Sequence, residues 1–334
     1  MGPIRRYSRR SRARDGVFDE QLRLLMREYS NADSSDPVRA VHSVSRVSLR
    51  AILLSGLGTV VRFGKVFTGY EVSASGAVTA TFDDGSTATG DVLVGADGVR
   101  SVVRRQLLPA AGYADPRAIG IGGKLALTPE TEAWLPVQLT SSKNMILPRR
   151  DFLFTSVFRR RDPSDTTDSD YVMWAYVAHR SALPADLQGH VLARLGGWHP
   201  DLRRLVGESD PSSIQSFDFT AGQRVSGWES RPVTLLGDAI HPMPPVGGLG
   251  GNAALFDART LCAALTAVQS GERSLVEAVR GYESAMRAHG FGAAAEAQRY
   301  TKLAASRSRV LRRTARGFFR FCGLVPPVRR AIFE

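Results

Sequence analysis

The feature that most constrains the fold is residues 233–265, in which a short apolar strand, a loop rich in proline and glycine, and a long helical pattern follow one another. The apolar run VTLL ends at Gly237 and Asp238. This places a carboxylate at the carboxyl end of a buried strand, where open α/β sheets bind ligands. Residues 242–251 then contain three prolines and four glycines. Prolines stiffen a loop and glycines let the backbone approach a ligand, so the segment predicts a binding loop.

The helix after this loop is expected to begin between Gly250 and Ala253. Its free N–H groups and the positive end of its dipole would then face the same space as the Asp238 carboxylate. An acid that binds hydroxyl groups, beside a helix terminus that attracts negative charge, suits a polyol phosphate or an anionic ring. We therefore expect a ligand of that kind at this junction.

A second junction of the same type occurs earlier in the chain. Asp97 and Gly98 follow the strand DVLVGA, and a helix is predicted over residues 100–108. Arg104 lies in the first turns of that helix, where its guanidinium can bind an acid or a phosphate as a bidentate donor. The pattern D-G-x-x-S-x-x-R thus indicates a second binding loop.

Length and composition exclude several classes of protein. The chain has 334 residues, of which 43% are apolar and 23% charged, as in ordinary globular proteins. No apolar run reaches the roughly 18 residues of a membrane span, and the arginine-rich start lacks the apolar core of a secretory signal. Two cysteines, Cys262 and Cys322, cannot form a disulfide framework or a cysteine-rich metal site. We expect a cytoplasmic protein without a metal ion.

The formal net charge of +12 belongs to the two ends of the chain. Residues 1–14 contain six arginines and residues 299–330 contain ten lysines and arginines, with no acid in either segment. The rest of the chain holds 28 basic and 32 acidic residues. A domain that binds nucleic acid would carry its excess charge on the folded binding face. We therefore expect no nucleic-acid partner, and residues 1–16 are predicted to be a disordered basic arm.

Hydrophobic periodicity predicts a mixed α/β protein. Phe18, Leu22, Leu25 and Met26 recur at helical spacing, and residues 59–94 alternate as an antiparallel meander with a hairpin turn at Asp84-Gly85. Further strands are expected near residues 38–44, 120–127, 152–159 and 171–178, after a turn at 31–37. Further helices are expected near residues 49–57, 185–195, 199–206, 274–288 and 291–316.

Taken together, the two junctions resemble one family, the FAD-dependent aromatic monooxygenases of the p-hydroxybenzoate hydroxylase type. GADGVRSVVR resembles the second fingerprint of that family, and GDAIHPMPPVGGLGGNAALFDA resembles the third, which holds the flavin ribityl chain. HSVSRVSLRAILLSGL resembles the helix that places an arginine against the flavin, which by position is Arg46. The resemblance covers residues 38–290 and includes the order and spacing of the three segments.

The resemblance implies an FAD/NAD(P)-binding Rossmann-like domain with an inserted mixed β-sheet and C-terminal helices. Residues 17–117 and 231–290 would form the FAD-binding domain, residues 118–230 the substrate-binding domain, and residues 291–334 the C-terminal helices. The implied activity is hydroxylation or epoxidation of an aromatic or polyketide-like small molecule with O2, using FAD reduced by NADPH or NADH. The implied cofactor-binding residues are Arg46, Asp97, Gly98, Arg104, Gly237, Asp238, Pro245, Gly247, Gly250 and Asn252.

Within that set the resemblance implies separate roles. Asp238 would bind the ribityl hydroxyls, and the helix after Gly250 would stabilise negative charge on the reduced ring. Asp97, Gly98 and Arg104 would organise the FAD and nicotinamide side. His241 would fix the loop, since no nearby histidine gives it metal-ligand spacing. No catalytic acid or base is assigned.

The sequence departs from the family at its start, because no strand, G-x-G-x-x-G turn and helix precede these segments. We therefore expect a truncated family member with weakened FAD retention, and a non-catalytic protein that keeps the fold is the first alternative. A membrane-associated isoprenoid epoxidase or reductase is the second.

Two aromatic-rich segments allow two interpretations each. The tail RVLRRTARGFFRFCGLVPPVRR could rest on an anionic membrane, but its apolar and basic positions do not separate into clean faces. Packing on the FAD-binding domain is therefore favoured for the tail. The aromatic residues within 152–158 and Trp174 could line a substrate pocket, and core packing explains them equally well.

Overall fold

The computed structural model describes residues 15–27, 46–159 and 169–333, which divide into two compact units. The first unit combines Met1–Val60, Arg117–Asp218 and Leu303–Glu334. The second combines Val61–Pro116 and Phe219–Lys302. The turn and strand predicted at residues 31–44 and most of the predicted N-terminal arm lie outside the described residues.

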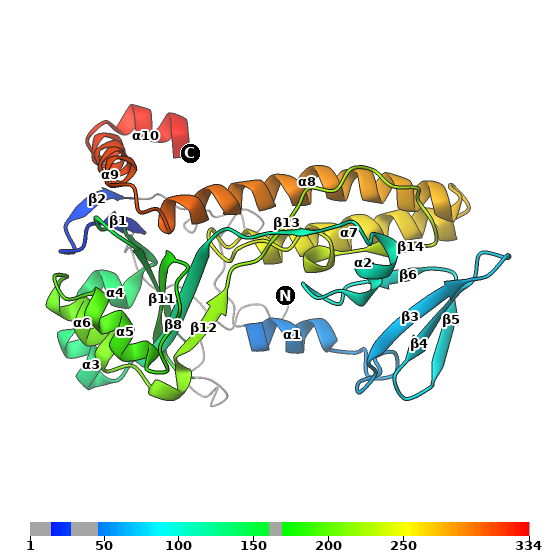
Figure 1. Ribbon diagram of the computed structural model, residues 1–334, viewed down its shortest axis with the longest axis horizontal. Helices are drawn as coiled ribbons and strands as arrows, with labels where there is room; N and C mark the ends of the chain where they lie inside the picture. Colours follow the sequence, from blue (N-terminus) through cyan, green and yellow to red (C-terminus); the bar gives the residue numbers. More distant parts are fainter. Residues whose placement is uncertain (1–14, 28–45, 160–168, 334) are drawn as a thin grey trace. The chain divides into compact units, whose positions relative to one another are not determined.

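The first unit is built on a seven-stranded sheet with the order β12-β8-β11-β10-β9-β1-β2 (Figure 1). Neighbouring strands are antiparallel except β1 and β9, which run parallel. The strands are β1 (Gly16–Phe18), β2 (Leu24–Arg27), β8 (Ala118–Ala126), β9 (Asn144–Ile146), β10 (Phe152–Phe158), β11 (Tyr171–His179) and β12 (Gln215–Asp218). The predictions of β8, β10 and β11 from alternating apolar residues are thus confirmed.

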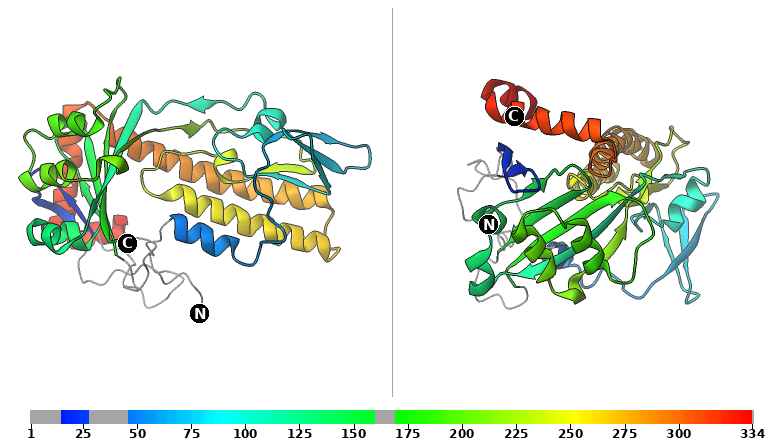
Figure 2. Two further views of the ribbon diagram at one scale, coloured as in Figure 1. Left: turned by 90° about the horizontal axis from the view of Figure 1, so that it is seen from below. Right: turned by 60° about the vertical axis from the view of Figure 1, so that its left-hand side comes forward.

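Short helices cover one face of this sheet (Figure 2). They are α3 (Pro129–Trp134), α4 (Val137–Ser141), α5 (Leu187–Arg194) and α6 (Pro200–Gly207). The core between them and the sheet includes Trp174, whose indole N–H donates to Ser209 Oγ at 2.8 Å. Trp174 is fully buried, so core packing explains this residue. The helices predicted near residues 185–195 and 199–206 correspond to α5 and α6.

The prediction of an amphipathic helix through residues 18–26 is wrong. Those residues form the hairpin of β1 and β2, with Leu22 in the turn at a φ of 55°. Phe18, Leu25 and Met26 are buried, as the apolar pattern required, but their backbone conformation is set by strand pairing, of β1 with β9 and of β2 with β1. Pairing across the sheet outweighs a weak local helical preference.

The predicted boundaries differ from the structure at several points. Asp15 and Gly16, at the end of the predicted disordered arm, are buried, and Asp15 Oδ1 accepts from Lys143 N at 3.1 Å. β1 and β2, predicted within the FAD-binding domain, belong to the unit of the seven-stranded sheet, where β1 pairs with β9. Residues 219–230 belong instead to the second unit. The assignment of FAD and substrate to particular domains stays a prediction.

The second unit contains a three-stranded sheet, β3 (Phe67–Val72), β4 (Val78–Phe82) and β5 (Thr87–Gly90), and two strand pairs. The pairs join β6 (Leu93–Gly95) to β14 (Val233–Leu235), and β7 (Tyr113–Ala114) to β13 (Ala221–Gly222). The meander is confirmed from Phe67 onward, with Gly85 at a φ of 78° in the predicted turn. Residues 59–63, predicted as its first strand, are not in a strand.

The helices of the second unit include α2 (Val102–Leu107), α7 (Leu249–Gln269) and α8 (Leu275–Ala304). The two helices predicted at residues 274–288 and 291–316 are instead α8, then α9 (Arg309–Leu324) and α10 (Pro326–Phe333). Gly290 lies inside α8. Because it has no side chain, the helix can pack closely against His241 at this point. Of the described helices, none has the length and hydropathy of a membrane span.

Candidate functional site

The two predicted binding loops leave the same edge of one strand pair. β6 and β14 are parallel and in register, with Gly95 opposite Leu235, and Leu236 N donates to the Gly95 carbonyl oxygen at 2.9 Å. The carboxyl ends of parallel strands point the same way, so the loop after β6 and the loop after β14 start side by side. The structure thus brings Asp97-Gly98 and Gly237-Asp238 to neighbouring strand ends.

In the loop after β6, the Asp97 side chain caps α2. Its Oδ2 accepts from Val102 N at 2.7 Å and from Val103 N at 3.3 Å. A carboxylate at this position satisfies free N–H groups of the first helical turn and complements the helix dipole. Gly98 adopts a φ of 76°, which favours glycine. The Asp97 carboxylate, which was predicted to organise the cofactor side, therefore stabilises its own loop.

Arg104 is also engaged inside this loop. The residue is 3% exposed, and its guanidinium donates to the Val99 carbonyl oxygen at 3.0 Å and lies 4.3 Å from the centroid of the Tyr113 ring. The Tyr113 hydroxyl donates to the same carbonyl oxygen. Burial lowers the pKa of Arg104, and the Asp97 charge opposes that shift. The side chains of Asp97 and Arg104 thus fix the loop shape, and direct contact with a cofactor stays a prediction for both.

The loop after β14 is held by an acid that the sequence-based set did not include. Gly237 begins the short turn η4 (Gly237–Ala239) at a φ of 61°, and its N–H donates to Asp257 Oδ2 at 3.0 Å. The same oxygen lies 2.6 Å from His241 Nε2. His241 and Asp257 are 1% and 0% exposed. One carboxylate on α7 therefore closes both ends of the turn that carries Asp238, which is itself exposed.

The His241 ring is packed tightly against α8. A Cβ on Gly290 would collide with the imidazole, and Phe291 packs edge-on against it. His241 Nδ1 and Asp257 Oδ1 make no hydrogen bond among the described residues. The loop-fixing role expected for His241 is thus confirmed by its contacts.

A second buried acid stands behind β14. Glu283 on α8 is 2% exposed and accepts hydrogen bonds from Trp228, Ser230 and Thr234 at 3.0, 2.7 and 3.0 Å. Burial raises the pKa of Glu283, although the three hydrogen bonds oppose that shift. Next to it, the Tyr282 hydroxyl donates to the Leu235 carbonyl oxygen at 2.7 Å. These contacts attach α8 to β14, the strand that precedes Asp238.

The remaining predicted residues lie at the junction of the loop and α7, with Pro245 and Gly247 in the loop and Gly250 and Asn252 in the first turn of the helix. Pro245, Gly247 and Asn252 are exposed, and Gly250 is half-buried. Gly247 has a φ of 90° and Gly248 a φ of 67°, conformations that favour glycine. α7 begins at Leu249, one residue before the predicted range, so the free N–H groups of its first turn lie in this loop.

The glycines leave space that a ligand can fill. A Cβ on Gly98, Gly248 or Gly251 would meet nothing within 4 Å, and one on Gly250 would come no nearer than 3.6 Å to Met243. Packing of the protein therefore does not require glycine at Gly250 or Gly251. An exposed carboxylate, a helix N-terminus and open backbone at two neighbouring strand ends fit a cofactor with hydroxyl groups and negative charge.

Arg46 belongs to a different unit from the other predicted residues. It is the exposed first residue of α1 (Arg46–Leu54) in the first unit, whereas the other nine lie in the second. Its contact with the flavin stays a prediction. Among the described residues, no group of three His, Cys, Asp or Glu side chains is placed to hold a metal ion.

Sequence analysis missed Asp257, although a signal was present. Ala253, Asp257 and Leu261 are the buried residues of α7, and they recur at every fourth position along the helix. An acid at the buried spacing of a helix requires a hydrogen-bond partner inside the protein. The spacing in the sequence therefore indicated that this acid is buried, but it did not indicate which groups form its hydrogen bonds.

Comparison with known proteins identifies a matching family and several relatives. The family described as "FAD binding domain" matches residues 26–295. The dual O-methyltransferase/FAD-dependent monooxygenase elcB of Phaeosphaeria nodorum is 32% identical over 292 residues, covering 74% of this chain and 31% of that protein. The FAD-dependent urate hydroxylase of Klebsiella pneumoniae is 31% identical over 248 residues, covering 72% of this chain and 59% of that protein. The chain thus spans about a third of the length of the first curated relatives it matches.

Solved structures extend the likeness to the fold. A structure from Photorhabdus luminescens, assigned as an FAD-containing monooxygenase, is 34% identical with a TM-score of 0.78, covering 90% of this chain and 80% of that one. Klebsiella pneumoniae HpxO, complexed with FAD and uric acid, is 21% identical with a TM-score of 0.80, covering 95% of this chain and 78% of that one. The HpxO likeness concerns the fold alone.

Proposed function

The chain belongs to the FAD-binding domain family that FAD-dependent aromatic monooxygenases share, and we propose that it is an FAD-dependent monooxygenase. Its substrate is an aromatic or polyketide-like small molecule, and its reductant is NADPH or NADH. The observation that carries the proposal is the pair of loops that leave neighbouring parallel strands, β6 and β14, beside the N-terminus of α7. A relative named as a urate hydroxylase, 31% identical, supports an aromatic substrate.

The residues that would hold FAD lie in the loop after β14. The exposed Asp238 carboxylate would accept hydrogen bonds from ribityl hydroxyls. Gly247, Gly248 and Gly250 let the loop backbone approach the ring system, and the N-terminus of α7 stabilises negative charge there. When bound, FAD supplies the activation of O2 once NADPH or NADH has reduced it.

The chain's own residues supply a rigid site. Asp257 and His241 hold the turn that carries Asp238, and Asp97 and Arg104 hold the neighbouring loop. A site whose loops are ordered before the ligand arrives loses less conformational entropy on binding. The family resemblance assigns residues 118–230 to substrate binding, and on that ground we place the substrate on the seven-stranded sheet of the first unit.

The test exploits the room at Gly250. Because a Cβ at this position meets only Met243 at 3.6 Å, Gly250→Ala should fold as well as the wild type. If the loop backbone contacts the flavin, the same methyl group should weaken FAD binding by about tenfold or more, a loss of roughly 1.4 kcal/mol. Quenching of flavin fluorescence on titration measures the affinity.

Gly292→Ala is the matched control. Gly292 lies in α8, is exposed, and has nothing within 4 Å of the position of a Cβ. It should gain the same helical preference as Gly250→Ala without any change in FAD affinity. Equal FAD affinities for the two variants would remove the proposed contact at Gly250. A wild-type chain without measurable FAD affinity would favour the non-catalytic alternative.

A further inference from the structure

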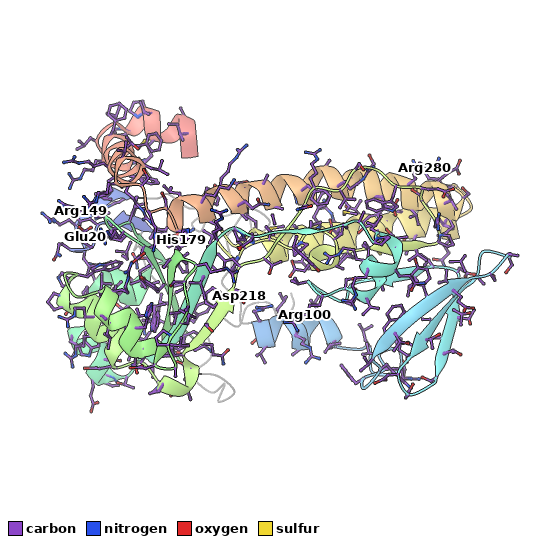
Figure 3. The ribbon with its side chains drawn as sticks, viewed as in Figure 1. Glu20, Arg100, Arg149, His179, Asp218 and Arg280 are labelled. Atoms are coloured by element: carbon purple, nitrogen blue, oxygen red, sulfur yellow. The ribbon has the colours of Figure 1, made fainter. Side chains whose placement is uncertain are left out.

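The helix α9 is anchored to the first unit by one of its faces. Gly323 lies so close to β2 that a Cβ would collide with the carbonyl oxygen of Leu25, and Cys322 is fully buried. Arg316 Nη1 donates to Glu20 Oε2 at 2.6 Å, where Glu20 lies beside β2 (Figure 3). These contacts fix the rotation of the helix about its own axis.

Arg312 anchors the start of the same helix. It is 1% exposed, and its guanidinium donates to the carbonyl oxygens of Ala304 and Ser306. Burial lowers the pKa of Arg312 to about 10, so it remains charged at neutral pH. With Ser308 capping the N-terminus, the helix has a defined position between its two ends.

The opposite face of α9 exposes large apolar side chains. Val310, Leu311, Phe318, Phe321 and Leu324 are 73, 45, 42, 52 and 82% exposed. They recur at helical spacing and form one stripe along the helix. Contiguous apolar stripes of this kind are rare on the surfaces of monomeric proteins and mark interaction sites.

A basic stripe runs beside the apolar one. Arg309, Arg313 and Arg320 are exposed and also recur at helical spacing, between the apolar stripe and the anchored face. Residues 299–330, which include α9, contain ten basic residues and no acid. The expectation that apolar and basic positions of the tail do not separate is therefore wrong. They separate once the buried side of the helix is known.

We propose that this face, Arg309 to Leu324 without its anchored side, docks on an anionic membrane surface. The apolar stripe would enter the boundary between headgroups and acyl chains, and the flanking arginines would bind lipid phosphates. Charge complementarity selects this occupant. A second copy of the chain would bring three arginines against three more, whereas an anionic bilayer offers apolar and negative layers in the same order as the two stripes.

Co-sedimentation with lipid vesicles tests the proposal on the full chain. Vesicles of phosphatidylcholine alone are compared with vesicles of equal parts phosphatidylcholine and phosphatidylserine. We expect binding to the anionic vesicles that falls about tenfold or more in Arg313→Glu/Arg320→Glu and in Phe318→Ser/Phe321→Ser. All four side chains are exposed, so circular dichroism should be unchanged.

A matched charge reversal distinguishes this face from general surface charge. Arg203 and Arg280 are exposed on α6 and α8, and Arg280 is labelled in Figure 3. Arg203→Glu/Arg280→Glu changes the net charge equally and should bind anionic vesicles as the wild type does. Equal losses in the two charge reversals, or no binding of wild type to anionic vesicles, would overturn the proposal. So would a dimer in analytical ultracentrifugation that Phe318→Ser/Phe321→Ser abolishes, since a second copy would then cover the face.

Discussion

The loops after β6 and β14 contain the same two residue types, an aspartate and a glycine, yet they use them differently. After β6, the Asp97 carboxylate accepts hydrogen bonds from N–H groups of the helix that follows it, α2. After β14, the turn is closed by Asp257 from α7, and Asp238 is exposed. In the loop after β14, a second acid from another helix therefore holds the turn that carries the exposed aspartate.

The difference has a simple cause in the spacing to the next helix. α2 begins at Val102, close behind Asp97, so the carboxylate reaches the free N–H groups of the first turn. α7 begins at Leu249, and the proline-rich loop separates it from Asp238. The N-cap of α7 is Gly248, which has no side chain to cap the helix.

Removing the second acid should have the largest effect. Asp257→Ala leaves the buried His241 ring and the Gly237 N–H without their acceptor, so we expect a loss of about 3–5 kcal/mol in the free energy of unfolding. Urea denaturation followed by circular dichroism measures it. Asp257→Asn keeps an acceptor oxygen and should lose less. If alanine is tolerated like asparagine, this acid does not hold the turn.

Asp238→Ala should show the opposite profile. The side chain is exposed, so the loss in the free energy of unfolding should be smaller than that of the buried Asp257→Ala. FAD binding should weaken by about 1.5–3 kcal/mol, the usual worth of a charged hydrogen bond. Titration of FAD into both forms measures the difference. Equal affinities would contradict the role of Asp238, and a large loss of stability would show that both loops use their own acid alike.

Asp97→Ala should have a smaller effect on folding than Asp257→Ala. Loss of a helix cap costs about 1 kcal/mol, and we expect that decrease in the free energy of unfolding. FAD affinity should fall less than in Asp238→Ala, because the capping oxygen is already occupied by α2. A drop in FAD affinity larger than that of Asp238→Ala would reverse the comparison between the loops.

The smallest effect concerns pH. Burial raises the pKa of Glu283 above its unfolded value, so the folded state holds this proton more tightly. That contribution to stability is complete below the unfolded pKa of about 4.3 and is lost as the pH rises through the raised folded pKa. Glu283→Gln removes this titration and should flatten this part of the stability profile. Identical pH profiles of wild type and variant would show that Glu283 does not cause this pH dependence of stability.

The sequence by itself determined the elements with strong local signals. Alternating apolar residues located β8, β10 and β11, and the Asp84-Gly85 turn located a hairpin, because side-chain burial and a positive φ leave a mark on every residue involved. The glycine and proline loop before α7 was equally plain. These features depend on neighbours along the chain.

Only the tertiary structure decided which groups meet across the fold. Residues 18–26 pair as strands because β9 is available beside them, and α9 acquires an apolar stripe because β2 fixes which side is buried. Asp97 and Asp238 look alike in sequence, but Asp257 lies close to only one of the two turns by virtue of α7 packing. A hydrogen bond depends on distance and direction in space, and a linear pattern specifies neither for residues far apart along the chain.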